Sequence, residues 1–385
     1  MNKNSEMGLQ ATVFALVAAA FTTIYITQPV LPVLQAEFGV TEAKSSLTIS
    51  IVILGISLAN LPFGMIADRF PLRPVIGMGG LIIGLCGFFC AYTDRLTWLI
   101  CARFVQGMFI PSLTTCLAAF LSRNLPNERL NVVMGAYVAA TVAGGLGGRL
   151  LGGLIHPPLH WRYAFVTASC VLWTVTLIAF QYLNEPRPNH IREPDMDGFA
   201  GLLLRPPLIR MYGVAFGAFF VFSSVFNYLP FYLSSPRLNA STETITFLYL
   251  SYVVGIFIGP FSGRLSNRIG NGVSMSLGSI VFMISIGITL IPSIPIIAAS
   301  LFGVCAGYFT IHSSASGLLN RSLRGSQGRA NSLYVLFYYL GGYTGITISG
   351  HIYGRMGWLG VTVASEIMLL IPLIMGLVEI RKQKK

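Results

Sequence analysis

The sequence predicts an all-helical membrane protein with twelve transmembrane helices in two related six-helix bundles. Three observations predict it: the chain is unusually apolar, apolar runs of membrane-spanning length recur along it, and its second half repeats positions of the first. Of the 385 residues, 54% are hydrophobic and 10% are charged, whereas an average soluble domain carries about 25% charged residues. The mean hydropathy of +0.71 therefore indicates a membrane protein.

Apolar runs divide the chain into twelve candidate spans, each near the roughly 20 residues that a helix needs to cross a bilayer. They lie near residues 10–36, 45–67, 74–93, 97–122, 130–155, 162–183, 208–235, 244–266, 273–291, 294–318, 328–354 and 358–380. The first run is longer than the apolar core of a signal peptide, and no small-residue cleavage site precedes Pro29. We therefore expect it to be retained as a helix.

The basic residues indicate which loops face the cytoplasm. The net charge is +12, but the basic residues are spread over many short loops without a basic stripe, so they do not indicate a nucleic-acid partner. With both termini in the cytoplasm, 18 of the 25 Lys and Arg fall on the cytoplasmic side and 5 on the far side. This asymmetry predicts a multi-pass protein with cytoplasmic termini.

The two halves of the chain repeat one another at an offset of 197 to 199 residues. Matched positions include Pro32 with Pro230, Pro62 with Pro260, Gly144 with Gly341, and Trp161 with Trp358. One substantial polar stretch separates the halves. We expect an N-terminal six-helix bundle over 1–183, a cytoplasmic linker over 184–207 and a C-terminal bundle over 208–385. Such duplication is typical of secondary transporters, which bind substrate near the membrane midplane between the repeats.

A glycine, an acid and two arginines end the second span: Gly64, Asp68, Arg69 and Arg73. This stretch resembles the signature loop of the major facilitator superfamily. The resemblance implies the major facilitator fold, with Gly64 allowing close helix packing and Asp68 latching one access state from the N-terminus of another helix. The second-half counterparts are Gly263, Asn267 and Arg268. The alternative is a plain basic turn that obeys the positive-inside rule.

Span 4 carries Arg103, Gln106 and Gly107, which resemble the second motif of the superfamily, with a buried arginine near the central cavity. A charge in the apolar zone costs at least about 2.5 kcal/mol, so the presence of Arg103 indicates a structural or functional role. Two roles remain open: Arg103 braces helices through carbonyls and polar groups, or it helps to bind substrate or protons.

Span 5 carries glycines at the spacing of the antiporter motif, which marks drug/proton antiporters: Gly135, Gly144, Gly148, Gly152 and Gly153. They are expected to permit tight helix contacts and a bend. Arg149 stands where that motif has proline. It either attracts an anionic group of the substrate or bonds carbonyls and keeps the bend. This departure and the polar runs of spans 7, 10 and 11 resemble the YnfM-like branch of bacterial twelve-helix transporters. The resemblance implies a place in the bacterial inner (cell) membrane.

The remaining polar residues within spans are candidates for the substrate or proton pathway: Tyr25, Gln28, Tyr137, Asn227, Tyr228, Tyr232, His312, Tyr334, Tyr338 and Glu366. For each tyrosine the alternative is a hydroxyl bonded to a neighbouring carbonyl. Because residues 11–36 contain no acid, His312 is the best buried proton carrier, unless packing neighbours simply hold it. Glu366 either takes part in coupling or makes a structural hydrogen bond.

Enzyme signatures are missing from the sequence, which contains neither a Walker loop nor a Gly-x-Ser-x-Gly elbow. We expect a transporter without cofactor, driven by a proton gradient, that works as a monomer in the lipid bilayer. Three functions remain: a proton-coupled exporter of amphipathic or anionic organic molecules, a proton-linked importer of a small organic anion or nutrient, and a non-transporting sensor or scaffold. The glycine motif favours the exporter.

Overall fold

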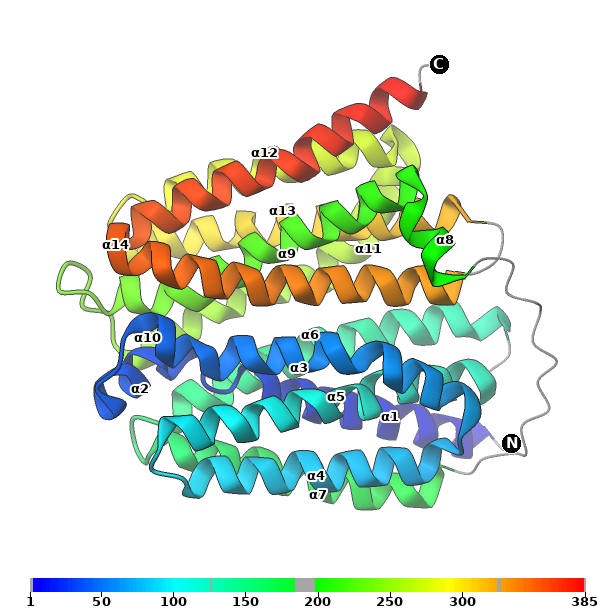
Figure 1. Cartoon of the computed structure of the whole chain (residues 1–385), viewed down its shortest axis with the longest axis horizontal. Helices are drawn as coiled ribbons and strands as arrows, with labels where there is room; N and C mark the ends of the chain where they lie inside the picture. Colours follow the sequence, from blue (N-terminus) through cyan, green and yellow to red (C-terminus); the bar gives the residue numbers. More distant parts are fainter. Residues whose placement is uncertain (1–2, 125–126, 184–197, 324–326, 384–385) are drawn as a thin grey trace. The chain divides into compact units, whose positions relative to one another are not determined.

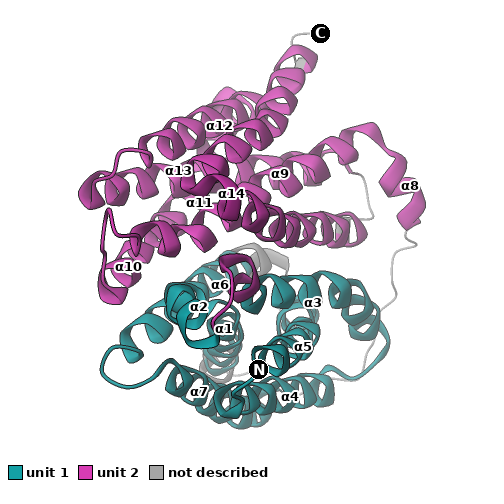
Figure 2. Ribbon diagram, turned by 60° about the vertical axis from the view of Figure 1, so that its left-hand side comes forward, with its two compact units in different colours: residues 1–38, 47–190 teal, residues 39–46, 191–385 magenta. Residues whose placement is uncertain are grey.

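The computed structural model describes residues 3–124, 127–183, 198–323 and 327–383, and every regular element in these ranges is helical. The chain forms two compact units, coloured separately in Figure 2. Unit 1 comprises residues 1–38 and 47–190, and unit 2 comprises residues 39–46 and 191–385. The all-helical class is thus as predicted, but the first turns of the second span group with unit 2.

Unit 1 contains the first six predicted spans. Its elements are α1 (Lys3–Tyr25), η1 (Gln28–Val30), α2 (Leu31–Phe38), α3 (Glu42–Arg69), α4 (Leu72–Tyr92), α5 (Leu96–Asn124), α6 (Asn127–Ile155) and α7 (Trp161–Tyr182) (Figure 1). The first predicted span is broken into α1, η1 and α2. Pro29 and Pro32 explain the break, because proline has no N–H for an i→i−4 bond and its ring crowds the preceding turn.

Unit 2 contains the other elements: α8 (Phe199–Leu204), α9 (Pro206–Leu233), α10 (Thr242–Leu248), η2 (Tyr249–Tyr252), α11 (Val253–Ile269), α12 (Asn271–Ile288), α13 (Ile294–Arg321) and α14 (Gln327–Gln383). Residues 184–197 of the predicted linker lie outside the described residues. The rest of the predicted linker is partly helical, because it contains α8 and the start of α9. The apolar run 202–204 explains this helix, because Leu202 is buried.

Ten helices in the described ranges are long and apolar enough to cross a membrane, or eleven if the bent pair Thr242–Ile258 and Phe261–Ile269 is one span. One of the ten, Gly328–Lys382, has 55 residues. At 1.5 Å per residue it would measure about 80 Å, against a hydrocarbon core of about 30 Å. The backbone leaves helical geometry at Gly357, with φ 58°, and Figure 1 shows α14 folding back on itself. Two spans there, with the bent pair counted as one more, bring the number to the predicted twelve.

Glycines set the closest helix contact of each unit. A Cβ built on Gly144, Gly148 or Gly152 of α6 would lie within 3.0 Å of the carbonyl oxygen of Ala18, Thr22 or Ile26, respectively. Both series advance by four residues, so one face of α6 runs against the backbone at the end of α1 and just beyond it. Gly341 and Gly345 of α14 approach Phe216 and Phe220 of α9 in the same way. The repeat seen in the sequence is therefore a repeated helix contact.

Two predicted packing glycines do not make such contacts. A Cβ on Gly135 or on Gly64 would meet no described atom within 4 Å, and the same holds for Gly263. The close packing expected at Gly135 and Gly64 is therefore not present in this structure. Gly153 is buried.

Candidate functional site

Arg149 forms the clearest cluster of predicted site residues. Its side chain is 2% exposed. Nε donates a hydrogen bond to Oε1 of Gln28 at 2.7 Å, and Nη1 donates to the carbonyl oxygen of Gly145 at 2.7 Å. The guanidinium carbon lies 3.9 Å from the centroid of the Tyr25 ring, a cation–π distance. The structure thus brings Tyr25, Gln28 and Arg149 into one buried site within unit 1.

The local fold explains why these three side chains meet. The glycine contacts hold α6 against α1, and the break after Tyr25 puts Gln28 in the short helix η1. The partners named above orient the guanidinium. A guanidinium held in this way presents planar N–H groups, which suit a negatively charged group.

Arg103 is fully buried and donates mainly to backbone carbonyls. Nε donates to the carbonyl of Thr48 at 2.9 Å, and Nη2 donates to that of Ile24 at 2.5 Å. Nη1 donates to the carbonyl of Thr23 and to Oε1 of Gln106, both at 2.6 Å. Carbonyls in the last turn of a helix lack intrahelical partners and attract a cation. These contacts support the bracing alternative for Arg103.

The rest of this motif also holds helices together. Nε2 of Gln106 donates to the carbonyl of Ile83 in α4 at 3.1 Å. A Cβ on Gly107 would lie within 3.0 Å of the backbone of Val52 in α3. Arg103 and Gln106 therefore connect α5 to α1, α3 and α4. We assign both a positioning role.

A second cluster of predicted residues surrounds His312 in unit 2. The hydroxyl of Tyr334 lies 3.0 Å from Nδ1 of His312, and the hydroxyl of Tyr308 donates to that of Tyr338 at 2.7 Å. The His312 ring centroid lies 5.3 Å from that of Tyr338 and 6.1 Å from that of Tyr308. Helices α13 and α14 supply these residues.

Phenylalanines of α9 line the same cluster. Phe219 stacks on Tyr338 and Phe222 stacks on Tyr308, each with 3.8 Å between ring centroids. His312 and Tyr338 remain partly exposed while Phe219 and Phe222 are buried. The arrangement offers one titratable ring among aromatic faces.

Four other predicted residues contact neither the Arg149 cluster nor the His312 cluster. Tyr137 donates to the Thr114 carbonyl at 2.6 Å, and Tyr228 donates to the Ile346 carbonyl at 2.8 Å. Asn227 donates to Oγ of Ser46 at 2.8 Å, and Tyr232 stacks on Trp358 with 5.2 Å between ring centroids. Tyr137 and Tyr228 therefore fit the alternative of a hydroxyl bonded to a carbonyl. Their bonds are structural.

Glu366 lies half-buried in the second arm of α14. On one side it borders the exposed Val363 and Ile367, and on the other the buried Thr362 and Ser365. No hydrogen bond or ion pair joins its carboxyl to another described residue. The structure does not bring Glu366 into the His312 cluster, so its part in coupling stays a hypothesis.

The latch residues lie at the ends of α3 and α11. Asp68, Arg69, Asn267 and Arg268 are exposed. Arg73 begins the next helix, and its Nη2 donates to the carbonyl of Phe180 at 2.7 Å.

Sequence inspection missed an arginine beside each half of this latch. Arg123 donates to the carbonyl of Ala67, next to Asp68, and Arg321 donates to Oδ1 of Asn267 at 2.5 Å. The two arginines are 198 residues apart, within the offset of the repeat, and that spacing was the signal that could have revealed them.

Replacing Asp68 by asparagine should slow transport by roughly 2- to 5-fold while leaving membrane insertion intact. The reason is that the change removes an exposed carboxylate whose contact with a helix N-terminus is worth about 0.3–1 kcal/mol. Initial transport rates and the amount of protein in the membrane measure the two effects. Asn267→Ala, at the uncharged matching position, should slow transport less. Normal transport by Asp68→Asn would refute the latch.

Comparison with known proteins agrees with this architecture. The sequence profile of the Major Facilitator Superfamily matches residues 13–346. The inner membrane transport protein YnfM of Escherichia coli is 28% identical over 376 residues, which cover 96% of this chain and 90% of that protein. A multidrug resistance protein B homolog of Mycobacterium tuberculosis is 30% identical over 181 residues, 47% of this chain and 33% of that protein.

A solved structure shares the fold. It is a bacterial homolog of the human lysosomal transporter Spinster in an inward-facing, occupied conformation, with a TM-score of 0.83 at 15% identity, covering 99% of this chain and 98% of that one. The profile match spans most of the chain, and the helix count and the repeated helix contacts agree with it. The chain belongs to the major facilitator superfamily and is a multi-pass membrane transporter of the secondary type, not an enzyme.

Proposed function

We propose that this transporter exports small anionic or amphipathic organic compounds in exchange for protons, by alternating access, with both termini in the cytoplasm. The buried Arg149 cluster carries the proposal. A buried guanidinium costs at least about 2.5 kcal/mol in a membrane, and a hydrogen bond to a charged group returns about 1.5–3 kcal/mol. An anionic group of the substrate would make such a bond each time it binds.

The planar guanidinium suits a carboxylate, sulfonate or phosphate, because two N–H groups can contact two oxygens at once. The Tyr25 ring under the guanidinium and the neutral Gln28 partner fix its orientation. Similarity of part of the chain to the multidrug resistance protein B homolog favours export.

Transport into membrane vesicles tests direction and coupling together. Everted vesicles should accumulate an anionic aromatic dye when lactate energises the membrane, and an uncoupler should abolish the accumulation. Accumulation only in right-side-out vesicles would mean import instead of export. Accumulation that survives the uncoupler would exclude proton coupling.

We expect His312→Gln to abolish transport driven by a pH gradient but to retain substrate exchange. Histidine is the side chain whose ordinary pKa, about 6.5, lies nearest to physiological pH, and in this cluster only Tyr334 bonds its ring nitrogen. Glutamine keeps polarity but cannot carry a proton. Counterflow of labelled substrate and pH-driven uptake, measured in the same proteoliposomes, separate the two activities.

Tyr334→Phe is the matched control, because it removes the hydroxyl that contacts His312 but keeps the ring and the histidine. It should weaken pH-driven transport only partly. If pH-driven accumulation persists in His312→Gln, the proton is carried elsewhere, with Glu366 as the next candidate.

A further inference from the structure

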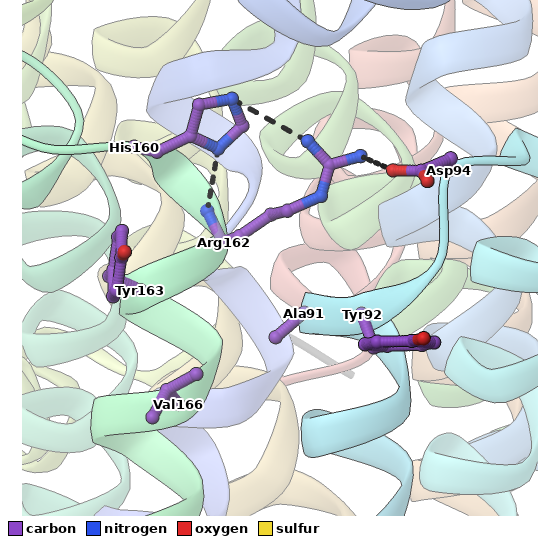
Figure 3. A pocket seen from close by; sticks show the side chains of 7 residues that line it. All are labelled: Ala91, Tyr92, Asp94, His160, Arg162, Tyr163 and Val166. Carbon is purple, nitrogen blue, oxygen red and sulfur yellow. Dashed lines mark hydrogen bonds and ion pairs between the residues drawn. The ribbon is translucent and has the colours of Figure 1, made fainter.

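A pocket of about 510 Å³ opens where α4 ends and α7 begins, within unit 1. Its lining combines acidic, basic, aromatic and apolar side chains: Ala91, Tyr92, Asp94, His160, Arg162, Tyr163 and Val166. Figure 3 shows Arg162 between His160 and Asp94, with Tyr92 and Tyr163 on different helices. None of these residues belongs to the substrate or proton clusters.

An ion network fixes the polar wall of this pocket. Nη1 of Arg162 donates to Oε1 of Glu37 at 2.6 Å, and Nη2 donates to Oδ1 of Asp94 at 3.1 Å. Nδ1 of His160 accepts the backbone N–H of Arg162 at 3.4 Å, and its Nε2 lies 3.6 Å from Oε2 of Glu37 and 3.5 Å from Nη1 of Arg162. Two carboxylates therefore face one guanidinium. The Asp94 side chain is 91% exposed, so its carboxylate is accessible.

An exposed apolar stripe runs along α4 to the pocket. Met78, Leu81, Leu85 and Phe89 are all exposed, and their spacing of three or four residues continues to Tyr92 at the pocket. From Met78 to Tyr92 the helix rises about 21 Å, more than the roughly 15 Å depth of one leaflet of a 30 Å hydrocarbon core. The stripe is apolar and long enough for a lipid acyl chain to lie along it.

A different face of α4 packs against α7. A Cβ built on Gly77, Gly80 or Gly84 would lie within 3.0 Å of the side chain of Phe180, Thr176 or Trp173, respectively. The apolar stripe is offset from this glycine face by one residue, or about 100° around the helix. The stripe is therefore free to contact lipid while the glycines hold α7.

We propose that this pocket binds the headgroup of a phospholipid with a primary ammonium, whose acyl chain lies along the stripe of α4. The accessible Asp94 carboxylate and the tyrosine rings attract the ammonium. The phosphate lies beside Arg162, whose guanidinium also donates to Glu37, Asp94 and the carbonyl of Thr93. Exposed Tyr92 and Tyr163 stand at helix ends, where aromatic residues gather at membrane interfaces. A choline headgroup offers no N–H to Asp94, and a glycerol headgroup offers no cation.

Native mass spectrometry of the purified protein tests this proposal with phosphatidylethanolamine, phosphatidylcholine and phosphatidylglycerol of identical chains at equal concentrations. The wild-type protein should retain the ethanolamine lipid at least about threefold over the choline lipid. Asp94→Asn should remove that preference, and its exposure makes unfolding an implausible cause. Glu243→Gln, which removes another exposed acid outside the pocket, should keep the preference. Equal retention of all three lipids by the wild type, or an unchanged preference in Asp94→Asn, would overturn the proposal.

Two further measurements separate a lipid from a soluble ligand and test the aromatic walls. O-phosphoethanolamine carries the same ammonium and phosphate without acyl chains, so it should fail to displace the lipid at equal concentration. Displacement would show that the site takes a soluble solute. Tyr92→Ala should lower retention of the ethanolamine lipid about threefold or more, whereas Tyr182→Ala, an exposed tyrosine at the other end of α7, should not. Loss in both variants would contradict a specific site.

Discussion

Gly148→Ala should destabilise the protein and abolish most transport, whereas Gly147→Ala should stabilise it slightly. A Cβ at Gly148 would lie within 3.0 Å of the Thr22 carbonyl oxygen and carbon, so α6 and α1 must separate. Overpacking of this kind costs about 1–3 kcal/mol, more than the roughly 0.8–1 kcal/mol that alanine gains over glycine in a helix. A Cβ at Gly147 meets only Oγ1 of Thr22 at 3.5 Å, an ordinary contact.

Thermal unfolding of the purified variants measures the opposite signs of these two changes, and transport assays measure the consequence for the Arg149 site. The two glycines are neighbours in the same helix, and both variants are made and measured in the same way, so each serves as the control for the other. Equal stability and equal transport in the two variants would show that the α1–α6 contact is looser than described.

Replacing Arg149 should change substrate binding in proportion to what each side chain retains. Lysine keeps the charge but not the planar fork, so Arg149→Lys should raise KM. Methionine keeps only the length, and loss of a charged hydrogen bond of about 1.5–3 kcal/mol should weaken binding roughly 10- to 100-fold. Arg149→Pro restores the residue usual in the antiporter motif but should fail as badly as methionine. Initial rates against substrate concentration give KM and maximal rate for each variant.

The bracing alternative gives a different pattern. Nη1 of Arg149 bonds the Gly145 carbonyl one turn earlier in its own helix, and a proline at 149 would bend the helix at that turn. Wild-type transport by Arg149→Pro would show that the position only shapes the helix.

The sequence predicted the fold because apolar runs and repeated glycines follow directly from spanning a bilayer and from close helix contact. Gly144, Gly148 and Gly152 advance by four residues, and that spacing alone places them on one face of a helix. The break after Tyr25 was not predicted, although Pro29 and Pro32 were visible. An apolar run does not show whether its prolines kink a helix or interrupt it.

The sequence singled out Tyr25, Gln28 and Arg149 as pathway candidates but did not show that they meet. Tyr25 and Gln28 were expected on one helix face, whereas the break after Tyr25 places them in α1 and η1. The partners of Arg103 were not predictable, because backbone carbonyls leave no trace in residue identity. Phe219 and Phe222 were likewise hidden, since a phenylalanine that lines a cluster and one that faces lipid look alike in an apolar run.

Proton movement in proteoliposomes tests the central claim most directly. An aromatic sulfonate, which stays ionised, is added to vesicles containing the purified protein and a trapped pH-sensitive dye, and the matching uncharged sulfonamide is added in parallel. The account predicts that only the sulfonate changes the internal pH, and that Arg149→Met and His312→Gln both abolish the change. Equal proton movement with the sulfonamide, or an undiminished response in Arg149→Met, would contradict proton-coupled transport of organic anions through this site.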